Sequence, residues 1–208
     1  MSVPLSTVLT TARTFLNDDN ATVHTDPVLI PKIQQAHREL QEQLWISGSP
    51  VVRSQALLAY LTASGTALPA LPSDFLCPTA LFENAAASTV ASAGWLPMTE
   101  AFYIPLGTAV AATLNWWSWQ QEQIVIAGAS ANRAVIVQYR RQLPKPVLLN
   151  DPIGILFGES FLAARGAALS AGALLNDTLY AYLSGIADKS LANVISSNRG
   201  QQKPSLKP

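Results

Sequence analysis

Two stretches near the N-terminus carry apolar residues at the three-to-four-residue spacing of an amphipathic helix. The first covers residues 5–16, and the second begins at Asp26 and ends near Trp45. Asp26 followed by Pro27 predicts the start of the second helix, because an aspartate can cap a helix and proline suits its first position. The apolar positions that define the two faces are Leu5, Val8, Leu9, Ala12, Phe15, Leu16, Ile30, Ile33, Ala36, Leu40 and Leu44.

The middle of the chain changes to short runs rich in valine and isoleucine, which are typical of β-strands. The two strongest runs, at 123–127 and 134–139, flank a small and polar stretch at 128–133. This arrangement predicts a β-hairpin with a longer loop. Around it we expect weaker elements, namely strands at 51–62, 79–83 and 107–115, an extended segment at 68–75 and a helical turn at 98–103.

After residue 150 the sequence predicts two C-terminal helices, at 155–175 and 176–195, and the second has an apolar face made of Leu179, Tyr182, Leu183, Ile186 and Leu191. The predicted fold class is α+β, an α-helical bundle from the N- and C-terminal helices with an inserted, mostly antiparallel β-sheet. Residues 196–208 are polar, basic and proline-containing, so we expect them to be disordered when free. The expected domains are 1–50 for the N-terminal bundle helices, 51–150 for the β-rich insert, 151–195 for the C-terminal bundle helices and 196–208 for a flexible basic tail.

Charged residues make up only 12% of the 208 residues, about half of their usual share, whereas apolar residues make up 49%. A chain this poor in charge predicts an oligomer or a docked partner, because one copy leaves apolar surface uncovered. Thirteen basic and thirteen acidic residues exclude a strong net attraction to nucleic acid or to an anionic membrane. No apolar run reaches about 18 residues, so we expect no membrane-spanning helix and no membrane partner. Residues 1–4 lack the features of a secretion signal, which predicts synthesis in the cytoplasm.

The candidates for catalytic or metal chemistry are weak. Ser160 lies in G-E-S-F-L, which begins like a nucleophile elbow, but Leu162 replaces the final glycine and both histidines lie upstream. Cys77 has no basic neighbour in the sequence to activate it, which favours a packed thiol. His24 and Asp26 are too few for a metal site. We therefore expect no catalytic residue, no metal and no cofactor, and a hydrolase acting through Ser160 is a minor alternative.

Trp116, Trp117 and Trp119 form the most distinctive cluster in the sequence. Such a cluster can anchor a protein interface, fill a core or stack on sugar rings. We favour core or interface, and keep a carbohydrate- or receptor-binding module as the alternative function. Arg140 and Arg141 are expected to be inter-subunit partners, since a neutral chain more often uses arginines in this way than for binding phosphates.

The order of these features resembles the head-to-tail adaptor, or connector, proteins of tailed bacteriophages. In that family a helix with a D-[acid/Pro]-x-[I/L] start carries an A-x-R-E-[L/I] signature, and here residues 26–30 precede 36–40 (AHREL). The family's LP-x-DF segment is matched by residues 71–75. Its W-x(n)-I-x-[I/V] and V-x-V-x-Y strands are matched by Trp119 with residues 124–126, and by residues 135–139. Two helices close the chain in both cases, and the resemblance covers residues 5–190.

The resemblance implies a structural virion protein without catalysis. Such adaptors form a ring, commonly twelve-fold, between the portal protein and a tail or nozzle protein, and DNA passes through the ring without sequence-specific binding. It also implies that the C-terminal segment 190–208 docks on the portal, with Ser190, Arg199, Lys203 and Lys207 as candidate contacts. The expected location is the head–tail junction of the virion.

Overall fold

The structure is a computed structural model that describes residues 3–61, 68–85, 90, 93–105, 112–131 and 133–198. The chain divides into two compact units. The helical unit comprises Met1–Val52 and Leu143–Pro208, and the β unit comprises Arg53–Gln142. The predicted α+β fold class is confirmed, because helices from both ends of the chain flank an inserted, mostly antiparallel set of strands. Residues 143–150, expected in the β-rich insert, group with the helices.

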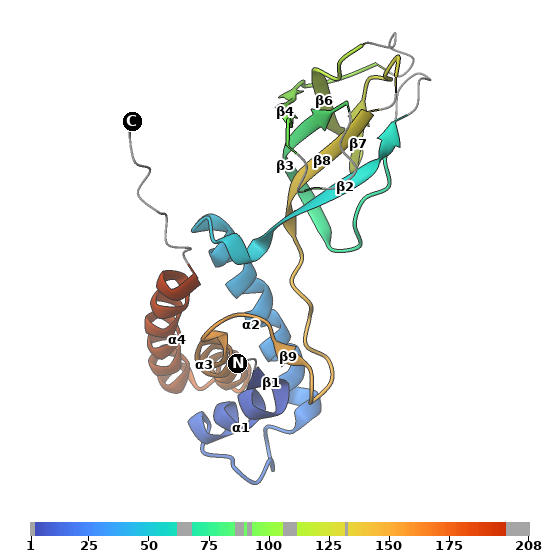
Figure 1. Ribbon diagram of the computed structural model, residues 1–208. Coiled ribbons are helices and arrows are strands. Elements are labelled where there is room, and N and C mark those ends of the chain that lie inside the picture. The colour runs from blue at the N-terminus through green and yellow to red at the C-terminus, as the bar shows by residue number, and fades with distance from the viewer. Residues whose placement is uncertain are drawn as a thin grey trace. The chain divides into compact units, whose positions relative to one another are not determined.

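Four α-helices dominate the described part of the helical unit (Figure 1). The helices predicted at 5–16, 26–45, 155–175 and 176–195 are confirmed, with small shifts at their ends. The strands β1 and β9 form a two-stranded antiparallel sheet within this unit. The elements are β1 (Val3–Pro4), α1 (Leu5–Phe15), α2 (Asp26–Ile46), the 3-10 helix η1 (Pro50–Val52), β9 (Pro152–Ile153), α3 (Gly158–Ala173) and α4 (Asp177–Asn198).

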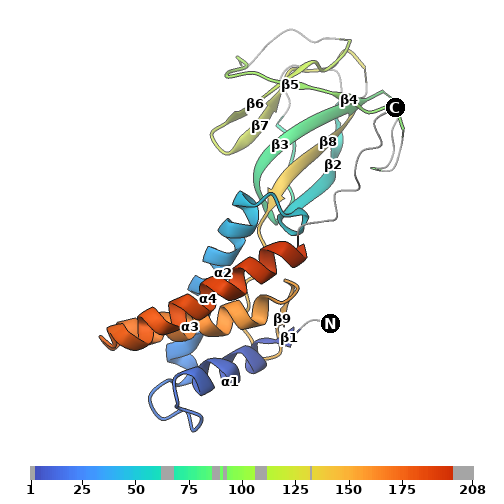
Figure 2. The same ribbon diagram turned by 90° about the vertical axis from the view of Figure 1, so that its left-hand side faces the viewer.

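Helix α3 is the centre of the helical unit and packs against α1, α2 and α4 (Figures 1 and 2). Its buried positions are mostly small, including Ala163, Ala164 and Ala167. At Gly166 an added Cβ would lie 2.8 Å from Cγ1 of Ile33 on α2, so the close crossing of the two helices depends on the glycine. Among the described helices, none has the length and apolar character needed to cross a lipid bilayer.

The start of α2 differs from the prediction by one residue. Thr25, not Asp26, is the N-cap, and Asp26 is the first residue of the helix. The carboxylate of Asp26 instead pairs with the guanidinium of Arg13 on α1. An acidic side chain in the first turn also interacts favourably with the helix dipole. The aspartate therefore links α1 to α2 rather than capping α2.

The β unit contains two sheets whose apolar faces share one core. Strand β8 lies between β2 and β3 and is antiparallel to both. In the second sheet β6 pairs antiparallel with β7 and parallel with β5. The strand orders are β2 (Arg53–Leu61), β8 (Arg133–Arg141), β3 (Phe75–Asn84) and β4 (Leu96–Pro97) in the first sheet, and β5 (Thr99–Glu100), β6 (Trp116–Gln120) and β7 (Gln123–Ile126) in the second.

The predicted hairpin between 123–127 and 134–139 is wrong, although both runs are strands. β7 forms its hairpin with β6, and β8 belongs to the other sheet. The turn between β6 and β7 is Gln121 and Glu122, both with positive φ, at 48° and 59°. Two-residue hairpin turns favour this backbone, but asparagine and glycine are its usual residues. Gln-Glu therefore gives little signal of the turn in the sequence.

Several weaker predictions also change. The helical turn expected at 98–103 is wrong, because Thr99–Glu100 is strand β5. The strand expected at 79–83 is confirmed but extends over Phe75–Asn84. Of the strand expected at 107–115, residues 107–111 lie outside the described residues, and residues 112–115 precede β6. The flexible tail does not begin at residue 196, because α4 continues to Asn198, and residues 199–208 lie outside the described part.

Candidate functional site

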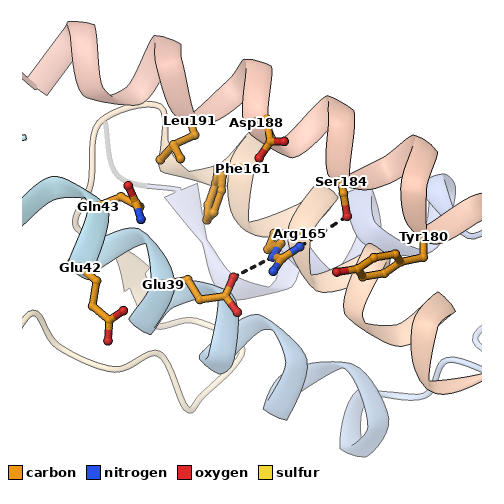
Figure 3. Close-up of a pocket in the computed structure, with 9 residues that line it drawn as sticks. All are labelled: Glu39, Glu42, Gln43, Phe161, Arg165, Tyr180, Ser184, Asp188 and Leu191. Carbon is orange, nitrogen blue, oxygen red and sulfur yellow. Dashed lines mark hydrogen bonds and ion pairs between the residues drawn. The ribbon is translucent and has the colours of Figure 1, made fainter. Parts of the chain in front are cut away.

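A groove of about 500 Å³ runs between α2, α3 and α4 of the helical unit (Figure 3). Its lining combines the apolar side chains of Phe161 and Leu191 with polar and charged groups. Three carboxylates and one guanidinium give this lining an acidic balance. The residues that line the groove are Glu39, Glu42, Gln43, Phe161, Arg165, Tyr180, Ser184, Asp188 and Leu191.

The guanidinium of Arg165 is already engaged by its neighbours in the groove. Its Nε donates to Oε2 of Glu39 at 2.6 Å, and Nη1 donates to Oγ of Ser184 at 3.4 Å (Figure 3). The hydrogen bond from Arg165 to Glu39 raises the pKa of the guanidinium above its usual value. Because Glu39 is matched by Arg165, the remaining negative charge comes from Glu42 and Asp188. The ion pair between Arg165 and Glu39 links α3 to α2.

A second groove, of about 440 Å³, lies in the β unit and is rich in aromatic and apolar side chains. We call it the aromatic groove. The ring of Phe75 lies 5.6 Å from that of Trp119 and 5.1 Å from that of Tyr139, measured between centroids. The Tyr139 hydroxyl donates to Oδ1 of Asp74 at 2.8 Å. Burial raises the pKa of Tyr139 above its usual value. The lining residues are Leu71, Pro72, Phe75, Leu76, Trp119 and Glu122.

The three tryptophans of β6 do not form one platform. Trp117 is 2% exposed and belongs to the core of the β unit, whereas Trp116 is 53% exposed. Neighbouring side chains of a strand point to opposite faces, so Trp117 and Trp119 share one face and Trp116 lies on the other. Of the three, Trp119 lines the aromatic groove. Their assignment to inter-subunit contacts stays a prediction.

The other predicted interface residues fall in different places. Arg140 and Arg141 end strand β8, where Arg140 lies opposite Arg53 of β2. Ser190 is half-buried on α4. Arg199, Lys203 and Lys207 lie outside the described residues, so their role in docking stays a prediction.

The residues considered for catalysis lie within ordinary helices and strands. Ser160 is exposed in the first turn of α3, not at the strand-to-helix turn that a nucleophile elbow requires. His37 is buried in α2, and this burial lowers the pKa of its imidazole below the usual value. Cys77 is half-buried on β3. The absence of catalytic residues and of a cofactor nevertheless stays a prediction.

His24 and Asp18 organise the loop between α1 and α2, a role that the sequence did not reveal. Nδ1 of His24 lies 2.8 Å from the Ser170 hydroxyl on α3. The Asp18 carboxylate accepts hydrogen bonds from the Thr22 hydroxyl and from the main-chain amides of Thr22, Val23 and His24, and these bonds lower its pKa well below the usual value. Within the described residues, His, Cys, Asp and Glu do not gather in a group of three or more that could hold a metal ion.

Comparison with known proteins adds no relative: the chain matches no protein-family model and no curated protein.

Proposed function

We propose that this chain is a structural head-to-tail adaptor of a tailed bacteriophage, without catalytic activity. The observation that carries the proposal is that residues of the separate family-like motifs contact one another or the closing helices. Asp74 and Phe75, from the segment L-P-S-D-F, contact Tyr139 at the end of V-I-V-Q-Y. Glu39, from A-H-R-E-L, pairs with Arg165 on α3. Motif residues with such long-range roles are expected if the resemblance reflects a shared fold.

Exposed apolar side chains support an assembled protein. Phe102, Tyr103 and Trp116 are exposed in the β unit, and Leu148 and Leu175 are exposed in the helical unit. Large apolar side chains at the surface are typical of interfaces when they gather with few charges around them. The low overall share of charged residues fits the same interpretation.

In this proposal copies of the chain form a ring, expected to be twelve-fold, between the portal protein and a tail or nozzle protein. DNA passes through the ring without sequence-specific contacts, which fits the equal numbers of acidic and basic residues. The protein is assembled in the host cytoplasm and resides at the head–tail junction of the virion. Ser190 and the basic residues of segment 199–208 contact the portal.

The direct test is negative-stain electron microscopy of this protein mixed with the portal protein encoded in the same genome. An additional ring below the portal, with the symmetry of the portal, is the expected result. Portal particles that carry no added density, while the protein stays folded in solution, would contradict the proposal.

The tail is tested by truncating the chain after Asn198, since Asn198 itself belongs to α4. We expect the truncated protein to keep its circular dichroism spectrum and melting temperature but to lose portal docking. A matched variant, R199Q/K203Q/K207Q, keeps the length of the tail and removes its positive charge. If both variants dock like the wild type, the tail assignment is wrong.

The aromatic groove favours one alternative, a carbohydrate- or receptor-binding module. Phe75 and Trp119 offer ring surfaces there, and Glu122 offers a carboxylate at the edge. In that case soluble glycans should quench tryptophan fluorescence saturably, and Trp119→Ala should abolish the response. The absence of quenching across a glycan panel would remove this alternative.

A further inference from the structure

The turn that leads into α3 presents two apolar side chains to solvent. Ile155 is buried and accepts a hydrogen bond from the main-chain amide of Gly158 at 3.0 Å, which closes the turn. Between them, Leu156 is 47% exposed and Phe157 is 54% exposed. The turn therefore buries its two ends and exposes its middle.

The backbone of Phe157 has an unfavourable conformation. Its φ is 58° and its ψ is 16°, in the left-handed region. A bulky residue is rare there, because its Cβ crowds the neighbouring carbonyl, and the resulting strain is often found at functional positions. Glycine or asparagine would adopt this conformation at lower cost. A half-exposed aromatic ring therefore occupies a position where glycine or asparagine would cause less backbone strain.

The same turn is attached to the end of α4. The side-chain amide of Asn198 donates to the carbonyl of Leu156 at 2.9 Å and to that of Val194 at 2.8 Å. The Ser49 hydroxyl donates to the Asn198 carbonyl at 3.0 Å. Asn198 is buried and immediately precedes Arg199. The exposed turn is therefore attached to Asn198, after which the basic segment follows in the sequence.

The charge of the adjoining segment indicates what kind of surface would cover the turn. From Lys189 to the last residue of the sequence there are four basic residues and no acidic residue, and Arg199, Lys203 and Lys207 all follow Asn198. A pair of apolar anchors beside a run of cations complements an apolar pocket rimmed by carboxylates. Buried aromatic anchors supply most of the affinity of such contacts, and the charges supply rate and specificity.

We infer that Leu156 and Phe157 are the apolar anchor of the portal-docking surface, and that the basic segment after Asn198 is its electrostatic part. The partner is a protein surface with an apolar pocket bordered by acidic residues. This inference rests on the proposed function and deepens it, because it adds two anchor residues outside the tail.

The test compares two substitutions at strained, exposed positions on either side of α3. Phe157→Asn removes the ring while keeping a residue that tolerates positive φ. Leu175→Asn does the same after the other end of α3, where Leu175 is 87% exposed and has a φ of 58°. The measurements are binding to purified portal rings by surface plasmon resonance and the oligomeric state by analytical ultracentrifugation.

For Phe157→Asn we expect portal binding to weaken by about tenfold or more. Its melting temperature should stay within about 4 °C of the wild-type value, since relief of strain offsets the lost contacts of the half-buried ring. Leu175→Asn should bind the portal like the wild type. This pattern would support the anchor.

Wild-type affinity in Phe157→Asn would overturn the inference and leave the proposed function standing. A Phe157→Asn variant that binds the portal normally but no longer self-associates would also overturn it, because the turn would then contact a second copy. A wild-type protein that fails to bind the portal would instead contradict the proposed function and, with it, this inference.

Discussion

The centre of the helical unit and the core of the β unit are built from side chains of different size. At the centre of the helical unit, α3 presents alanines and Gly166, so that neighbouring helices approach closely. The core of the β unit is built around large residues, among them Trp117 and Tyr139, with the ring of Phe75 packed against it. The close helix packing around α3 depends on small side chains, whereas the core of the β unit depends on large rings.

This difference teaches how each unit should respond to mutation. A close helix crossing has no room for an extra methyl group, because packed interiors hold few voids. A core of large rings is most sensitive to truncation, which leaves a cavity. Removing atoms should therefore do harm at the large rings of the β-unit core, and adding a methyl group should do harm at the small residues at the centre of the helical unit.

The largest expected effect is that of Trp117→Ala in the β unit. Trp117 is buried between the two sheets, so its truncation should lower the free energy of unfolding by about 3–5 kcal/mol. Urea denaturation followed by circular dichroism measures the change.

Trp116→Ala is the matched control, since Trp116 neighbours Trp117 on β6 but points to the opposite face and is exposed. Its cost should stay below about 0.5 kcal/mol, as is usual for surface positions. Equal losses in the two variants would show that the strand, rather than the ring of Trp117, determines the effect.

The second prediction concerns an added methyl group at two helical glycines. Gly166→Ala places a Cβ 2.8 Å from Cγ1 of Ile33, and overpacking should outweigh the better helix propensity, with a net loss of about 1–2 kcal/mol. At Gly185 on α4 an added Cβ meets nothing within 4 Å, so Gly185→Ala should stabilise the protein by about 0.5–1 kcal/mol. Thermal unfolding of the two variants should shift in opposite directions, and shifts of the same sign would refute the close-crossing argument.

The two units also differ in how much of their structure the sequence predicts. Helices α1 and α2 follow a local apolar period, so their existence and approximate ends are predictable, whereas α3 is buried on most of its sides and shows no such period. Strand pairing is not local. The sequence predicts that β7 and β8 are strands, but the pairing of β7 with β6 depends on a turn of Gln121 and Glu122 that lacks the usual residues.

The candidate sites were harder to foresee for the same reason. The groove of the helical unit is organised by Arg165 and Glu39, which are 126 residues apart, and no spacing rule joins them. The strained turn at Phe157 gave no signal, because phenylalanine is an unexpected residue in the left-handed region. The residue type of Trp119 marks it as a candidate, but the sequence does not indicate that the ring of Phe75 packs against both Trp119 and Tyr139.

The smallest expected effect removes one oxygen atom from the aromatic cluster of the β unit. Tyr139→Phe keeps the ring packed on Phe75 and deletes the hydrogen bond to Asp74. At pH 8 the loss should be about 0.5–1.5 kcal/mol, because Asp74 is only half-buried and water can replace the hydroxyl. Urea denaturation of the two proteins at a series of pH values measures it.

The pH dependence of this difference identifies its cause. Burial raises the pKa of Tyr139 in the folded state above the unfolded value of about 10, so the folded state favours the neutral phenol. The stabilisation is therefore fully present below pH 10 and is lost as the pH rises through the folded pKa. The difference in free energy of unfolding between the wild type and Tyr139→Phe should therefore shrink as the pH rises above 10, because the variant has no phenol to ionise at this position. An advantage that stays constant over this range would mean that the hydroxyl is not buried in the folded protein as the structure places it.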